Sequence, residues 1–184
     1  MNFHLATKLS ALIMLAGAVF AIQPVFAQQI QIPSLQVCNA TKLAANAYVI
    51  IDTRKDLLHT GLFVLKGSLA CDPAGGTVNP IGALGLYSIS MSDSTIQGDI
   101  VFTTFDQLTS GGKHTPTLWV SGQCKAANVR GCHYWLMVVD NVRGQPVGKT
   151  FDVVSFLVLD EKGKRVAYGT GNVVDGDVTV SAAN

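Results

Sequence analysis

Four cysteines are the residues whose spacing points most directly to chemistry in this chain. Three pairings are formally possible, but Cys124 and Cys132 flank the polar segment 125–131, which has strand-like apolar sequence on either side. This spacing predicts a disulfide that closes one hairpin and leaves Cys38 to pair with Cys71. Metal and redox sites favour a close Cys-x-x-Cys or a Cys/His cluster, and neither spacing occurs. The cysteines therefore predict two structural disulfides.

Acidic residues in the C-terminal half suggest a second chemistry, the binding of calcium by carboxylate oxygens. Asp140 ends the most hydrophobic segment, Asp152 begins the next one, and Asp175 and Asp177 lie near the C-terminus. If the segments at Asp140 and Asp152 are antiparallel neighbours, their carboxylates meet at one end of the fold. The alternative is that these acids accept hydrogen bonds from backbone amides of nearby turns. No Asp-x-Asp-x-Asp-Gly loop is present, so we expect no cofactor and keep calcium as the alternative.

Aromatic and histidine side chains offer a third set of candidates. Trp119, Tyr134 and Trp135 suit a ligand-binding cavity, because such cavities are largely apolar, and they suit a hydrophobic core as well. His114 and His133 do not lie in a metal-ligand motif, and no serine lies in a G-x-S-x-G turn. The sequence therefore predicts no catalytic residue, and a secreted hydrolase is the least favoured class of function.

The first 27 residues have the pattern of a secretory signal peptide. Lys8 precedes the apolar run 9–21, and after Pro24 the segment 25–27 forms an A-x-A-like cleavage pattern before Gln28. The apolar run is shorter than the roughly 20 residues that span a bilayer. We therefore expect cleavage after residue 27 and export to the periplasm or the extracellular space, with no integral membrane span afterwards. Disulfides persist in those oxidising compartments.

Removing 27 of 184 residues leaves 157, which fits a single domain over 28–184. Of the 13 Lys and Arg residues only Lys8 lies in the leader, which leaves 12 against 12 Asp and Glu residues and a formal net charge of zero. The basic residues are scattered, which argues against nucleic acid as a partner. The charged fraction of 14% is low, so part of the surface is expected to be apolar enough to contact another protein.

Short β-type segments separated by turn signals make up the rest of the chain, which predicts an all-β fold. The runs 134–139 and 153–159 are apolar at successive positions, as in strands covered on both sides. An antiparallel β-sandwich of eight or nine strands is expected, with a closed β-barrel as the alternative. The predicted strands are 47–52, 61–69, 84–91, 98–105, 117–123, 133–140, 151–159, 165–169 and 173–180.

Turn chemistry adds three local predictions. The glycine-ended segment 160–163 suits a hairpin between the strands on either side of it. The stretches 72–85 and 110–114 are glycine-rich and are expected to be loops. Helix is expected only in short pieces, and the alanines of 40–47 make that segment the best candidate.

The order of several segments in the C-terminal half resembles small secreted β-rich modules of bacterial surface and extracellular proteins. The segments that carry this resemblance are 98–100, 121–124, 134–141, 151–159 and 172–173. The resemblance implies a β-rich fold and an extracellular location, and it assigns no catalytic residue.

These observations together predict an exported, disulfide-stabilised protein without enzymatic activity. It is expected to bind another protein or a copy of itself through apolar surface and strand edges. The alternative function is that of a periplasmic carrier of a small ligand or lipid, with an apolar cavity behind Trp119 and Trp135.

Overall fold

The computed structural model describes residues 41–51, 61–71, 80–92, 96, 98–141 and 151–181. The predicted signal peptide 1–27 and Cys38 lie outside these residues. The described part contains nine β-strands and no helix. The strands are β1 (Lys42–Ile51), β2 (Gly61–Ala70), β3 (Ile81–Met91), β4 (Gly98–Phe102), β5 (Gln107–Gly111), β6 (Thr117–Ala126), β7 (His133–Val139), β8 (Val153–Leu159) and β9 (Arg165–Ser181).

All neighbouring strands are antiparallel, in the order β4-β3-β2-β1-β9-β8-β7-β6-β5. A further pairing between β4 and β6 closes eight of the strands into a barrel and leaves β5 as an extra strand beside β6. The predicted all-β class is confirmed. Of the two architectures expected from the sequence, the closed barrel is the one observed, because hydrogen bonds run continuously around the strands instead of ending at the edges of two sheets.

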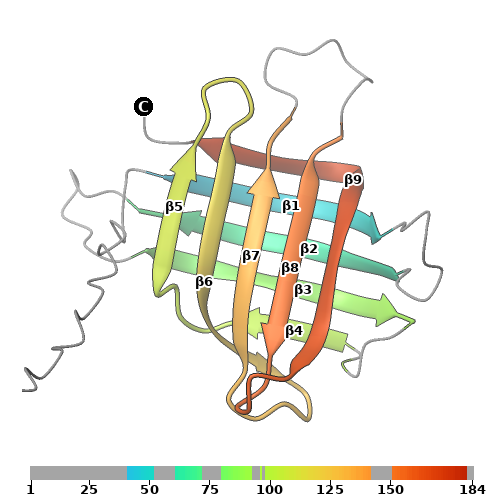
Figure 1. Cartoon of the computed structure of the whole chain (residues 1–184). Helices are drawn as coiled ribbons and strands as arrows, with labels where there is room; N and C mark the ends of the chain where they lie inside the picture. Colours follow the sequence, from blue (N-terminus) through green and yellow to red (C-terminus); the bar gives the residue numbers. More distant parts are fainter. Residues whose placement is uncertain are drawn as a thin grey trace, which may run out of the picture. The chain divides into compact units, whose positions relative to one another are not determined.

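The bend in strand β9 is the reason why the barrel looks like two crossed layers of strands in Figure 1. The strand first runs beside β8, up to the pair Val153 and Asn172, and then turns and pairs with β1 as far as Ser181. The sequence predicted two strands in this region, and this prediction was wrong in separating them. Glycines that suggest a turn instead allow close backbone contact at the bend: a Cβ on Gly171 would lie 2.4 Å from the carbonyl oxygen of Ile50.

Strands β4 and β5 follow the same edge of β6 in succession. Between them the backbone amides of Thr103 and Thr104 both donate to the carbonyl oxygen of Gln123, so the chain bulges where the register changes. The predicted strand 98–105 therefore ends earlier, at Phe102. The start of the predicted loop 110–114 instead belongs to β5.

The segment 40–47, expected to be helical, lies mainly in strand β1. Residues 42–47 alternate strictly between exposed and buried positions, and Ala45 and Ala47 point into the barrel together with Leu43. The reason is tertiary. Strand β1 is hydrogen-bonded to β2 on one edge and to β9 on the other, and these ladders outweigh the weak helical preference of alanine.

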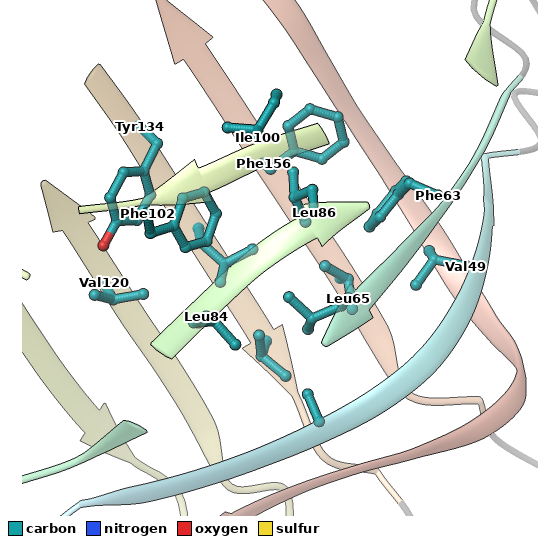
Figure 2. Close-up of a cluster of buried hydrophobic side chains, with 14 of the residues drawn as sticks. Val49, Phe63, Leu65, Leu84, Leu86, Ile100, Phe102, Val120, Tyr134 and Phe156 are labelled. Carbon is teal, nitrogen blue, oxygen red and sulfur yellow. The ribbon is translucent and has the colours of Figure 1, made fainter. Parts of the chain in front are cut away.

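Large side chains fill the interior of the barrel. Phe102 stacks on Tyr134 with ring centroids 3.7 Å apart, and Phe63 meets Phe156 edge to face at 5.0 Å (Figure 2). Burial, and to a smaller extent the charge of Asp106, raises the pKa of Tyr134. An eight-stranded barrel has an interior just wide enough for side chains to fill. The described inward positions thus form a packed core.

Two predicted hairpins are confirmed. Asp160 accepts hydrogen bonds from the backbone amides of Lys162 and Lys164 and so shapes the turn between β8 and β9. Cys124 and Cys132 form a disulfide across the β6–β7 hairpin, with Cα atoms 4.9 Å apart. Cys71 is disulfide-bonded as well. Its predicted partner, Cys38, lies outside the described residues.

Removing the Cys124–Cys132 bond in the double variant C124A/C132A should lower the free energy of unfolding by about 2.6 kcal/mol, because the bond restricts the unfolded chain. Urea denaturation of both proteins without reductant measures the difference. With reductant present the wild-type protein should lose at least as much stability, since Cys71 is reduced too. Equal stability of the two proteins in oxidising buffer would contradict a structural role for this bond.

Candidate functional site

The outward side chains of β5, β7 and β8, and of β6 as far as Gln123, form one surface of the barrel, which we call the outer face; the next outward residue of β6, the exposed Lys125, borders it. Successive residues of a strand point to opposite sides, so the buried residues alternate with those of the outer face. None of the residues of the outer face is Asp, Glu, Lys or Arg. They are Gln107, Thr109, Gly111, Thr117, Trp119, Ser121, Gln123, His133, Trp135, Met137, Val139, Val153, Ser155, Leu157 and Leu159.

Both tryptophans of the chain lie near the middle of the outer face. The register places Trp119 opposite Met137 and Trp135 opposite Ser121, so the two indoles occupy diagonal positions on neighbouring strands. Trp135 is 39% exposed, which is large for a residue in the middle of a sheet. Beside it lies a shallow depression lined by Gln107, Leu108, Thr109, Trp119, Val120, Ser121 and Trp135.

The three residues predicted to line a ligand cavity do not share one. Trp119 and Trp135 belong to the outer face, whereas the neighbouring Tyr134 points into the barrel. There its ring stacks on Phe102 and its hydroxyl group donates a 2.9 Å hydrogen bond to the carbonyl oxygen of Thr104. The two histidines compared with metal-ligand motifs are both exposed and lie apart: His133 faces Gln123 near one end of β6, and His114 precedes the other end.

Sequence reasoning did not assign Met137, Val153 and Leu157 to this surface. The runs 134–139 and 153–159 were correctly noted as apolar at successive positions, and every second residue of each run now proves to be half-buried or exposed. An alternating pattern was therefore present in both runs. It was hidden because the outward positions carry apolar residues, as the inward positions do.

The acidic residues predicted to meet at one end of the fold lie along the part of β9 that follows its bend. Beyond Asn172, β9 pairs with β1 alone among the described strands, and its other edge faces the ends of β7 and β8. Asp140 follows β7 and accepts a 3.0 Å hydrogen bond from the backbone amide of Val180. Asp152 precedes β8 and accepts one from the amide of Asn141 at 2.8 Å. The two carboxylates therefore accept hydrogen bonds from backbone amides that are not paired with a neighbouring strand in this region.

The fold changes the pKa of Asp152. Burial raises its pKa above the ordinary value of 3.8, and the charges of Asp140 and Asp177 raise it further. Hydrogen bonds from the backbone amides of Asn141 and Val178 act in the opposite direction. Burial is the largest cause and the net shift is upward, so ionised Asp152 is held at a cost to the fold.

The four acids considered as calcium ligands all accept hydrogen bonds from nearby groups. Besides the two contacts of Asp140 and Asp152, Asp175 accepts from the amide of Gly176 at 2.9 Å, and Asp177 accepts from the hydroxyl group of Thr179 at 2.9 Å. This is the arrangement expected of carboxylates that serve turns and strand ends. Within the described ranges, no group of three or more His, Cys, Asp or Glu side chains is placed to hold a metal ion.

The variant D152N should become more stable relative to the wild type as pH rises. A raised pKa means that the folded protein binds the Asp152 proton more tightly than the unfolded chain does. This stabilising contribution is fully present below 3.8 and is lost as pH rises through the folded pKa, whereas asparagine stays uncharged throughout. In urea denaturation, the free energy of unfolding of the variant should therefore increase relative to that of the wild type between pH 4 and pH 7.

The control is D152A, which removes the acceptor for the Asn141 amide and should lose about 1–3 kcal/mol at both pH values. If D152N instead lost stability relative to the wild type as pH rose, the ionised carboxylate would have to make a favourable interaction that outweighs the cost of its burial.

No helix among the described residues has the length and apolar character needed to cross a membrane. No family model matches the chain, and comparison with curated proteins and with solved structures found no similar protein.

Proposed function

We propose that this protein is exported, is stabilised by disulfides, and acts without catalysis by binding a polypeptide through the outer face of β5 to β8. The observation that carries the proposal is the absence of Asp, Glu, Lys and Arg from the outer face, together with the two tryptophans near its middle.

The composition of the outer face supports contact with protein. The buried centres of protein–protein interfaces are enriched in aromatic residues and Met and depleted of Lys, Glu and Asp. Trp119, Trp135 and Met137 lie together on β6 and β7 and match this pattern. Tryptophan is also among the residues whose truncation costs the most binding free energy. Trp135, at 39% exposure, has surface left to bury.

The packing of the interior favours surface contact over carriage of a ligand inside the barrel. Phe63, Phe102, Tyr134 and Phe156 occupy inward positions and touch one another in pairs. Barrels that carry small molecules keep a cavity open between their inward side chains. A carrier function would therefore require these rings to move.

Export is supported by the leader pattern and by the disulfide between Cys124 and Cys132. Mass spectrometry of the protein in the periplasmic fraction and the culture medium of its own host should detect a chain that begins at Gln28. Protein found only in the cytoplasm, with residues 1–27 still attached, would rule out this part of the proposal.

Photo-crosslinking in the host cell tests the contact. A photoreactive phenylalanine analogue at position 135 should give covalent adducts with a polypeptide, because this side chain lies in the middle of the outer face. The matched control places the analogue at Tyr48, which is 52% exposed on β1, outside the outer face. Adducts at 135 and not at 48 support the proposal. Absence of polypeptide adducts at 135 would refute it.

A further inference from the structure

Resting on the proposed function, we infer that the polypeptide bound by the outer face is a second copy of this chain, with the two outer faces packed against each other around a twofold axis. Three features of the described residues support this: the charge of the face, its relief and its size.

Charge comes first. In a twofold dimer each residue of the face meets residues of the same face, so any charge on it would approach its own kind or be buried without a partner. The outer face carries no Asp, Glu, Lys or Arg, so this cost does not arise. The mature chain as a whole has a formal net charge of zero, and a net charge near zero also favours association between copies.

The relief of the face suits a contact between copies. Trp135 is 39% exposed on β7 and forms one wall of the depression, which Trp119 and the smaller side chains of Thr109 and Ser121 also line. An exposed ring at the edge of a hollow suits a twofold contact, since each copy can supply the ring that enters the hollow of the other. The proposed arrangement inserts Trp135 of each copy into the depression of its partner.

The size of the face suits a contact of the weaker class. Three strands contribute seven residues each and β5 contributes five, and at about 3.4 Å per residue and about 4.8 Å between strands they cover roughly 420 Å² in projection. Two faces offer roughly 850 Å² in projection and more in accessible area, which is near the lower limit of about 1,200 Å² for standard interfaces, where weak and transient contacts are found.

Analytical ultracentrifugation of the processed protein from its own host tests the inference. The wild type should sediment as a dimer, and its dissociation should shift tryptophan emission to longer wavelength, because both tryptophans of the chain lie on the outer face. W135K should weaken dimerisation by about 100-fold or more, since it buries an unpaired charge and removes the projecting ring. S121K, which fills the depression with a charge, should do the same.

The control is Y48K, which makes a similar exchange of an aromatic ring for lysine on β1 and should leave the dimer intact. Far-ultraviolet circular dichroism and thermal melting confirm that each variant folds. Wild-type protein that stays monomeric at the highest concentration attainable overturns the inference. Dimers that survive in folded W135K and S121K overturn it too.

The two proposals fail in different ways. If the wild type is monomeric but position 135 crosslinks to a different polypeptide in the cell, the second copy is refuted and the proposed function stands. If the wild type is monomeric and position 135 gives no polypeptide adduct, both are refuted.

Discussion

Replacing Phe156 by alanine is expected to lower the free energy of unfolding by about 3–5 kcal/mol. Phe156 is 2% exposed and packs edge to face against Phe63, so its loss removes apolar surface from the core and leaves a cavity between β8 and β2 (Figure 2). A small domain has only about 5–15 kcal/mol of stability, so this variant should unfold at a much lower urea concentration.

Phe151 provides the matched control, because it lies five residues earlier in the chain and is 59% exposed. F151A should change the stability of the monomer by less than about 0.5 kcal/mol. Urea denaturation at one protein concentration compares the two variants. If F156A were as stable as F151A, the interior could not be packed around Phe156, and the barrel would have room for a ligand.

The second large effect is expected from Gly176, where strand β9 adopts a φ of +83°. A Cβ at this position would lie 2.0 Å from the carbonyl oxygen of Asn46 on β1, so G176A adds a clash with backbone to the strain of left-handed geometry. The two costs together should destabilise the protein by about 3–5 kcal/mol. Thermal melting and urea denaturation measure the loss.

The variant G163A separates the cost of the backbone conformation from the cost of the steric clash. The φ of +72° at Gly163 is similar, but nothing lies within 4 Å of the position of an added Cβ. G163A should therefore show the cost of the backbone conformation alone, about 1 kcal/mol. Comparable losses in G163A and G176A would mean that β9 and β1 do not approach each other as closely as the structure has them.

The parts of the fold that could be predicted from the sequence are those that depend on local chemistry. The turn at Asp160 and the hairpin closed by Cys124 and Cys132 combine a short loop with apolar strands on both sides, and both were predicted correctly. The all-β class followed from the short strand-like segments. Each of these features depends on residues close together in the sequence.

The parts that could not be predicted depend on distant contacts. Strand β5 has one fully buried apolar side chain, Leu108, and is a strand because it pairs with β6. The alanines of β1 are extended because β2 and β9 lie on either side. Closure into a barrel requires β9 to turn and pair with both β8 and β1, and its glycines suggest a break when only local signals are considered.

The same reasoning explains the candidate site. The chemistry of Trp119, Tyr134 and Trp135 made all three candidates for one ligand-binding cavity, and Tyr134 could not be separated from the two tryptophans until the direction of each side chain was known. The meeting of Asp140 and Asp152 was predicted on the condition that their strands are antiparallel neighbours, and β7 and β8 are. The role of Asp140 as an acceptor for Val180 depends on the bend of β9, which the sequence did not reveal.

The central claim is that the outer face is covered by a polypeptide in the working protein. Native mass spectrometry, without reductant, of wild-type protein and W135K purified from their own host tests it most directly. We predict that the wild type carries the mass of a second polypeptide and that W135K is a single chain. Wild-type protein that appears as one bare chain, or as one chain with a small organic molecule, would contradict the claim.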